Sequence, residues 1–359
     1  MICQDVNENS MDALLRRFGA PGTVFLVGAG ASSRLFPNIG QSLQCMLRLS
    51  RKCGFTVDDG EDAVKDNLVV RPAKKADSLV WEVAGIPENA LNVTGELAAR
   101  EAANRVTASA AKAIHIACAT LSYHRQDIPE YSVFRLCPPT TIATTNYDGL
   151  AAYCCRGLTH QVIHLHGLVP FRLVRDTWYA PFTEDCFIYG DGMKSSWDEV
   201  MRYRGLWLPK REQPGILQTS PYVSLQHALQ RCRALVVVGY SFSGMEDLHT
   251  FEIVTEMLKG RNPSLLFVSY PTPDDTCAEY ASLVSQAAKC GDTLVIKASW
   301  AALAATICDV YSEHPAHLDA LSDMVAHQYY DTWERMEQDA SAERKRQCRN
   351  CPLHKELLS

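Results

Sequence analysis

Residues 141–167 read TIATTNYDGLAAYCCRGLTHQVIHLHG, and the remainder of the chain can be interpreted from them. The apolar runs at the two ends of this stretch predict two buried strands, joined through about one turn of helix. Asn146 and Asp148 follow the first strand, and His166 follows the second. In an open parallel sheet, ligands bind at the carboxyl ends of the strands. We therefore expect an amide, a carboxylate and an imidazole at one binding edge, where they can hold hydroxyls or a carboxamide and exchange a proton.

The composition is that of a globular protein. A chain of 359 residues fits one large domain with additions, or two domains. Its 47% hydrophobic and 21% charged residues are ordinary for a soluble protein with a sizeable core. The balance of 35 Lys and Arg against 41 Asp and Glu gives a net charge of −6. This charge does not indicate direct nucleic-acid binding by the molecule as a whole.

The sequence shows no signal for secretion or membrane insertion. Its first residues, MICQDVNENSMDALL, contain neither a basic segment nor the apolar segment of a signal peptide. The longest apolar runs, such as residues 234–239, are of strand length and far shorter than a membrane span. We therefore expect a cytoplasmic protein without membrane association, whose 14 cysteines are reduced thiols and mostly small core residues.

A glycine-rich turn near the amino terminus follows another predicted strand. Residues 23–27 are continuously apolar, Gly28-Ala29-Gly30-Ala31-Ser32 come next, and a helical pattern resumes near Gln41. Strand, small-residue turn and helix form the layout of a nucleotide-binding crossover, in which the backbone approaches a pyrophosphate. Alone the turn is a weak signal, because Ser33 occupies the third glycine position of GxGxxG. A tight turn without a ligand explains it about equally well.

Short apolar runs alternate with helical patterns along the rest of the chain, and three of these runs lie at 234–238, 265–268 and 293–296. Continuous apolar strands between helices predict an α/β fold, with a Rossmann-like parallel sheet covered by helices on both faces. A helix is also predicted over residues 10–18, with Ser10 as its N-cap. Two C-terminal helices are expected at 300–311 and 318–336.

The segment between the glycine turn and the strand at 140–144 is far longer than an ordinary crossover. Residues of about 57–130 have a mostly helical pattern, so we expect a helical insertion over the ligand edge of the sheet. A helical subdomain that only adds core or an oligomer contact is the alternative, and the sequence does not separate the two.

The C-terminal tail is polar and basic, and it contains Cys348-x-x-Cys351 followed by His354. One CxxC pair with a trailing histidine is less than a full set of zinc ligands. A solvated tail is the favoured interpretation, and no metal is expected.

Four motifs occur in a fixed order, each at a predicted strand end: GAGAS at 28–32, TTNYDG at 144–149, HLHG at 164–167 and GYSFSG at 239–244. Together they resemble the sirtuin-like family, and this version is most similar to its prokaryotic, defence-associated branch of NAD-hydrolysing domains. The resemblance covers about residues 20–270. It implies an NAD-binding domain over 1–299, containing the helical insertion, and C-terminal helices with a polar tail over 300–359.

The resemblance also implies roles for individual residues. The cofactor-binding residues would be Gly28, Ala29, Gly30 and Ser32 around the pyrophosphate and adjoining ribose, with Gly239 and Ser241 at the adenosine half or its phosphates. Asn146 would hold the nicotinamide ribose and an attacking water, Asp148 would bind the carboxamide or orient Asn146, and His166 would be the catalytic base. Capping of the next helix is the alternative role for Asp148.

Two departures from the family pattern affect the expected activity. The family's deacylases carry two CxxC pairs after the His-Gly element, whereas only Cys186 and Cys232 lie between Gly167 and Gly239. The Pro-Asp-Phe-Arg run of deacylases is also missing after Ser32, and Arg34 and Phe36 are the candidate substitutes for it. We therefore expect an NAD glycohydrolase, which passes through an oxocarbenium-like transition state. A deacylase or ADP-ribosyltransferase, and a non-catalytic NAD or ADP-ribose-binding scaffold, are the alternatives.

The resemblance to the sirtuin-like family is the only basis for expecting particular partners. It implies an anti-phage effector that depletes cellular NAD and is held silent until triggered. It further implies a homo-oligomer, or action beside a partner such as a HerA-type ATPase or a short Argonaute.

His164 shares a strand face with His166, and is expected either to support the site or, more simply, to be a buried histidine bonded to the backbone.

Overall fold

The structure is a computed structural model. It describes residues 2–35, 122–146, 148–165, 220–240, 253–269 and 292–350, together with short strands between 172 and 195. The chain forms two compact units. The first contains residues 1–35, 124–166 and 209–340, and the second contains residues 36–123, 167–208 and 341–359. The seven-stranded sheet and the helix α12 (Trp300–Glu313), both described below, thus belong to the first unit.

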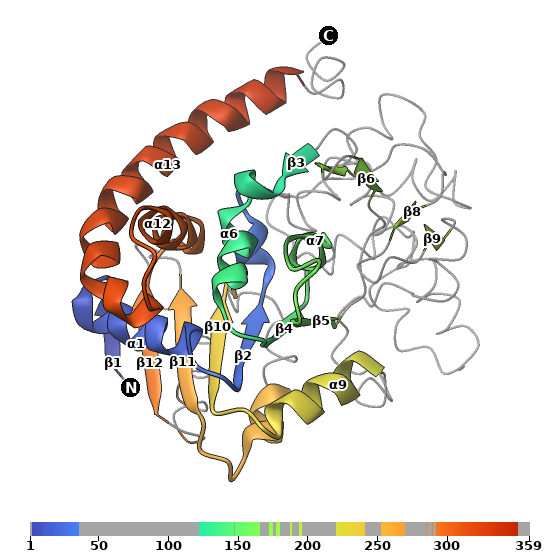
Figure 1. The fold of residues 1–359 in the computed structure, drawn as a ribbon, viewed down its shortest axis with the longest axis vertical. Helices are drawn as coiled ribbons and strands as arrows, with labels where there is room; N and C mark the ends of the chain where they lie inside the picture. The colour runs from blue at the N-terminus through green and yellow to red at the C-terminus, as the bar shows by residue number, and fades with distance from the viewer. Residues whose placement is uncertain are drawn as a thin grey trace, which may run out of the picture. The chain divides into compact units, whose positions relative to one another are not determined.

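The first unit is built on a seven-stranded parallel sheet (Figure 1). Its strands, in spatial order, are β1 (Ile2–Asp5), β12 (Thr293–Lys297), β11 (Ser264–Ser269), β10 (Ala234–Val238), β2 (Thr23–Val27), β4 (Thr141–Thr144) and β5 (Gln161–His164). This architecture confirms the predicted Rossmann-like α/β fold. Strand β1 escaped the sequence prediction, because its four residues, ICQD, form no apolar run.

Register places three of the motifs at one edge of this sheet. Val27 of β2 is level with Thr144 of β4 on one side and with Val238 of β10 on the other. All three strands run in the same direction, so the segments that follow them leave the sheet side by side. The glycine turn, the Asn146–Asp148 loop and Gly239 therefore emerge at the same edge.

One face of the sheet carries an aromatic core. Phe25 of β2 meets Phe18 at 4.7 Å and Phe134 at 5.0 Å between ring centroids. Phe18 ends helix α1 (Glu8–Phe18), and Phe134 lies in the turn η4 (Val133–Leu136). Trp300, at the start of α12 (Trp300–Glu313), packs against both of these rings. This core holds α12 and the segment before β4 against the sheet.

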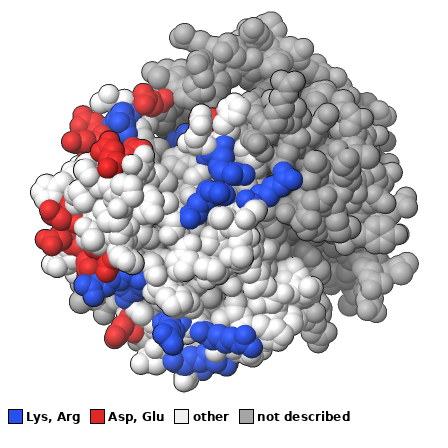
Figure 2. All heavy atoms as spheres, in the orientation of Figure 1, with Lys and Arg blue, Asp and Glu red and all other residues white. Residues whose placement is uncertain are grey.

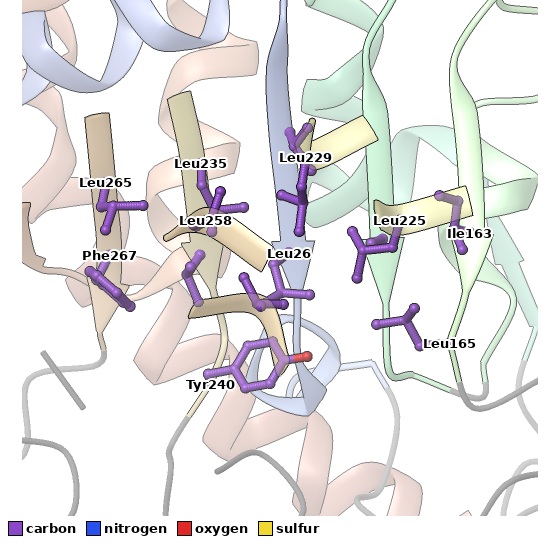
Figure 3. Close-up of a cluster of buried hydrophobic side chains, with 14 of the residues drawn as sticks. Leu26, Ile163, Leu165, Leu225, Leu229, Leu235, Tyr240, Leu258, Leu265 and Phe267 are labelled. Atoms are coloured by element: carbon purple, nitrogen blue, oxygen red, sulfur yellow. The ribbon is translucent and has the colours of Figure 1, made fainter. Parts of the chain in front are cut away.

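The opposite face is covered by α9 (Ser220–Leu229) and by a helix over 253–258. Figure 3 shows Leu225 and Leu229 of α9 among the apolar side chains of the strands, with Leu26 near the middle of the cluster. Strand residues alternate between the faces, so Val24 and Leu26 point here while Phe25 points to the aromatic side. The predicted coverage of both faces is confirmed.

Two helix ends differ from the prediction. Helix α1 begins at Glu8, and its N-cap is Asn7, whose side chain accepts a hydrogen bond from the Ser10 N–H at 3.0 Å. Ser10 is instead the third helical residue, and its hydroxyl accepts the Asn7 N–H at 2.9 Å, so the two residues cap each other. At the other end of the chain, α13 (Ser322–Asn350) continues well beyond residue 336, and part of the predicted tail is helical.

The region before β4 also departs from the predicted helical pattern. Residues 122–132 form a short strand, β3 (Ser122–His124), a turn, η3 (Arg125–Asp127), and the short helix α6 (Pro129–Ser132). The predicted insertion up to residue 121 lies outside the described residues. Strand β3 joins β7 (Thr177–Tyr179) and β6 (Arg172–Val174) in a three-stranded sheet, and β8 (Phe187–Ile188) pairs with β9 (Lys194–Ser195).

The described surface has an uneven charge distribution. Figure 2 shows acidic side chains on the side of α12 and α13, and basic side chains near α6 and at the lower edge. None of the described helices is both long and apolar enough to cross a membrane.

Candidate functional site

The glycine turn packs directly on the loop that follows β10. Gly28 donates its N–H to the Val238 carbonyl at 2.9 Å, and Gly30 donates to the Gly239 carbonyl at 2.7 Å. A Cβ on Gly28 would lie 2.6 Å from Cδ2 of Tyr240, and one on Gly239 would lie 2.1 Å from the Ala31 nitrogen. These glycines are therefore required by the contact between the two loops. The Gly30 N–H is already bonded within the protein.

The side chain of Asn146 faces this turn from the end of β4. Its Nδ2 lies 2.9 Å from the Gly28 carbonyl oxygen, 2.8 Å from the Tyr131 hydroxyl and 3.1 Å from the Ser32 hydroxyl. Turning the amide over would bring Oδ1 against the Gly28 carbonyl, which can only accept, so this carbonyl determines which end carries the NH₂ group. Asn146 is only 6% exposed.

The other end of the same amide lacks a hydrogen bond. Oδ1 of Asn146 is buried and has no hydrogen-bond partner among the described residues. A buried amide oxygen without a partner is costly, and it requires a physical explanation. A ligand hydroxyl or a water molecule that donates to Oδ1 would satisfy it.

Asp148 connects the cluster to the next helix. Its Oδ2 accepts a hydrogen bond from the Ser32 hydroxyl and lies 3.5 Å from the Tyr131 hydroxyl oxygen. Its Oδ1 accepts the N–H of Leu150 at 2.9 Å, at the start of α7 (Leu150–Cys154). Asp148 thus binds the first N–H of the helix with one oxygen and the glycine turn with the other, while Gly149 is the N-cap residue. Burial raises the pKa of Asp148 to about 6, although these hydrogen bonds act in the opposite direction.

Tyr131 was not predicted as part of the site. It comes from α6, is fully buried, and places its hydroxyl among Ser32, Asn146 and Asp148. Burial, followed by the charge of Asp148, raises the pKa of Tyr131 well above its usual value. No local pattern distinguishes this tyrosine from a core aromatic residue. The one sequence feature near Tyr131 is Pro129, two residues earlier, because proline is common at the first position of a helix.

Arg34 and Glu130 form an ion pair beside the cluster. Nε of Arg34 lies 2.7 Å from Oε1 of Glu130, and Nη2 lies 3.0 Å from Oε2. Nη2 also donates to the Asp127 carbonyl at 2.8 Å. The Arg34 side chain, a candidate substitute for the missing deacylase run, is therefore bound to this segment in the structure. The other candidate, Phe36, lies outside the described residues.

His164 lies at the end of β5, beside the backbone of Asn146. Its Nδ1 is 3.5 Å from the Asn146 carbonyl oxygen, and its Nε2 is buried without a hydrogen-bond partner in the described part of the chain. Burial lowers the pKa of His164 to about 4, so the ring is neutral at neutral pH. The position agrees with the simpler expectation of a histidine held by the backbone. His166, Ser241 and Tyr147 lie outside the described residues.

The structure therefore brings together side chains from two motifs, Ser32 from the glycine turn and Asn146 with Asp148 from the next loop, and adds Tyr131. Gly28, Ala29 and Gly30 form the turn itself, and Gly239 contacts it through the backbone. Within the described ranges, no group of three or more His, Cys, Asp and Glu side chains is arranged to hold a metal ion. Cys351 and His354 of the tail lie outside those ranges.

A separate surface depression lies at the amino ends of β2 and β4. It has a volume of about 590 Å³, and its lining includes Thr23, Thr140, Thr141 and Arg231. None of the clustered residues contributes to it. Because it occupies the opposite edge of the sheet from Asn146, it is not part of the candidate site.

No protein-family model and no curated protein matches the sequence. Among solved structures, a Sir2 enzyme matches with 10% identity and a TM-score of 0.40, over 92% of this chain and 99% of that one. A Sir2 homologue in complex with NAD matches with 13% identity and a TM-score of 0.35, over 89% and 94% of the two chains. Similarity at this level carries no conclusion about activity.

Proposed function

We propose that this protein is an NAD glycohydrolase, which cleaves the bond between nicotinamide and ribose to give nicotinamide and ADP-ribose. The observation that carries the proposal is the buried Oδ1 of Asn146, which has no hydrogen-bond partner among the described residues and lies at the edge where the glycine turn and Gly239 meet. The order of the four sequence motifs is independent support. Together they favour a dinucleotide that lies across this edge.

The proposed cleavage requires a hydrogen-bond acceptor for the ribose or the attacking water, a negative charge near the ribose, and a general base. Oδ1 of Asn146 would accept a hydrogen bond from a ribose hydroxyl or from the attacking water. Asp148 is ionised above about pH 6, and its negative charge would favour the positive charge that develops on the ribose. His166 would take the proton from water, a step that typically contributes ~10²–10⁴-fold to a rate. The backbone of Gly28–Ser32 would approach the pyrophosphate.

A biological role as an anti-phage effector belongs to the same proposal. Depletion of NAD would be toxic to the cell, so the activity would be controlled by assembly. The proposed partners are further copies of this chain, or a HerA-type ATPase or short Argonaute. A mass measurement in solution that finds only monomers with full activity would refute control by self-assembly.

Two other functions make different predictions for the same assay. A deacylase or ADP-ribosyltransferase would consume NAD only when an acyl peptide or acceptor protein is present. A binding scaffold would hold NAD or ADP-ribose without turnover. The absence of a CxxC pair between Gly167 and Gly239 disfavours the deacylase.

The test is incubation of the purified protein with NAD over a range of protein concentrations, with nicotinamide and ADP-ribose measured by chromatography. We expect turnover in the unaltered protein and its loss in Asn146→Ala and in His166→Ala. Asn262→Gly is the control, because it removes an exposed asparagine with a positive φ of 52° and should leave turnover unchanged. Undiminished turnover in both Asn146→Ala and His166→Ala would rule out the assignment.

A further inference from the structure

We propose that Tyr131 is a positioning residue, whose hydroxyl links the Asp148 carboxylate through Ser32 to Asn146 and thereby holds Oδ1 of Asn146 toward the ligand. The hydroxyl contacts Ser32, Asn146 and Asp148, each of which belongs to a recognised motif, while Tyr131 belongs to none. For its kinetic consequences, this inference rests on the proposed NAD chemistry.

The direction of each hydrogen bond in this cluster follows from the ionised carboxylate of Asp148. An ionised carboxylate can only accept hydrogen bonds, so the single proton of the Ser32 hydroxyl points at Oδ2 of Asp148. The contact between Ser32 and Tyr131 must then use the proton of Tyr131. The lone pairs of the Tyr131 oxygen are left for Nδ2 of Asn146, which lies 2.8 Å away.

This chain of donors runs from the Asn146 amide through Tyr131 and Ser32 to Asp148. It cannot reverse while Asp148 is ionised, because a carboxylate has no proton to give. The Gly28 carbonyl oxygen accepts a hydrogen bond from Nδ2 at 2.9 Å, and so favours the same orientation of the Asn146 amide. The charge on Asp148, carried across two hydroxyl groups, therefore acts together with the Gly28 carbonyl to hold the NH₂ end of Asn146 in place. Oδ1, which has no hydrogen-bond partner among the described residues, lies at the other end of the amide.

Among the described residues, two further ionisable groups lie beside this series of hydrogen bonds, Glu130 and His164. Glu130 lies on the same helix as Tyr131 and is paired with Arg34. His164 contacts the Asn146 backbone and is neutral above about pH 4. The Tyr131 hydroxyl donates to Ser32 and so strengthens the hydrogen bond that Ser32 donates to Asp148. Because hydrogen bonds to the carboxylate lower the pKa of Asp148, removal of the Tyr131 hydroxyl should raise that pKa.

The experiment compares Tyr131→Phe with Tyr329→Phe. Tyr329 is also fully buried and accepts a hydrogen bond from the Ser299 N–H at 2.8 Å, but it lies on α13. In Tyr131→Phe we expect kcat for NAD to fall about ten-fold, which corresponds to roughly one hydrogen bond, while KM is unchanged. The acid limb of the kcat profile should also move to higher pH. Tyr329→Phe should change neither.

A second measurement does not depend on turnover. The pKa of Asp148, followed by NMR from its carboxyl carbon, should rise in Tyr131→Phe and stay unchanged in Tyr329→Phe. An unchanged Asp148 pKa, or an unchanged kcat profile in an active protein, would overturn the role of Tyr131. Absence of both NAD turnover and ADP-ribose binding in the unaltered protein would instead refute the proposed function, while the Asp148 titration would still decide the inference.

Discussion

The Asn146 amide donates to the Gly28 carbonyl oxygen at 2.9 Å, and this bond joins two neighbouring strand ends that are 118 residues apart in the chain. It fixes the orientation of a side chain whose other end has no hydrogen-bond partner in the described regions. The site therefore depends on which atom of one amide faces inward. Substitutions at this site should therefore change the free energy of unfolding and the rate of NAD turnover in different ways.

Asn146→Asp keeps the shape of the side chain but places a carboxylate oxygen opposite the Gly28 carbonyl. We expect loss of NAD turnover and a decrease of ~2–4 kcal/mol in the free energy of unfolding at pH 8. The loss should be smaller at pH 5, because burial raises the pKa of the new carboxyl and its protonated form can donate to Gly28. Urea denaturation at the two pH values measures the difference. An equal loss at both would contradict the orientation described here.

Asp148→Asn should stabilise the protein while it reduces activity. Because the pKa of Asp148 is about 6 in the fold against an ordinary value of 3.8, the folded state binds the proton more readily than the unfolded state. Stability therefore falls as pH rises between these values, by about 3 kcal/mol in total. We expect Asp148→Asn to be more stable than the unaltered protein at pH 7.5, with the advantage fading below about pH 4. Melting temperatures across this range test it, and a difference independent of pH would disprove it.

Gly239→Ala should be far more damaging than Gly260→Ala. Both glycines have positive φ values, 69° and 75°, so an alanine at either position costs about 1–2 kcal/mol in backbone strain. A Cβ on Gly260 meets nothing within 4 Å, whereas one on Gly239 would overlap the backbone of Ala31 in the glycine turn. We expect an additional loss of several kcal/mol for Gly239→Ala in chemical denaturation, with loss of NAD binding. Similar losses for the two variants would show that the loops do not pack as described.

Arg34→Met should destabilise the protein more than removal of the whole ion pair does. The Glu130 side chain is fully buried and that of Arg34 is 30% exposed, so Arg34→Met leaves an unpaired carboxylate in the interior. We expect a loss of ~3–5 kcal/mol, and a smaller loss in the double variant Arg34→Met/Glu130→Met. The exposed pair of Arg16 with Asp12, also at 2.7 Å, is the control, and Arg16→Met should cost under about 1 kcal/mol. A double variant no more stable than Arg34→Met would refute the argument.

The sequence alone predicted six of the seven strands of the sheet, all except β1, and the edge at which the candidate site lies. Continuous apolar runs such as residues 23–27 and 234–238 are local patterns, and a run of strand length can be recognised without its neighbours. The small residues after β2 and the Asn and Asp after β4 were likewise placed correctly at strand ends. Parallel strands then bring their carboxyl ends to one edge, so these motifs were expected to meet.

Tertiary structure alone decided which atoms of the site touch. Tyr131 and Ser32 are 99 residues apart, and Ser32 and Asp148 are 116 apart, so their contacts depend on strand order, register and the docking of α6. None of these is a local property of the chain, which is why the sequence could not distinguish Tyr131 from a core aromatic residue. The raised pKa of Asp148 is likewise a consequence of burial, as is the lack of a hydrogen-bond partner for Oδ1 of Asn146 among the described residues. Burial exists only once distant segments have packed together.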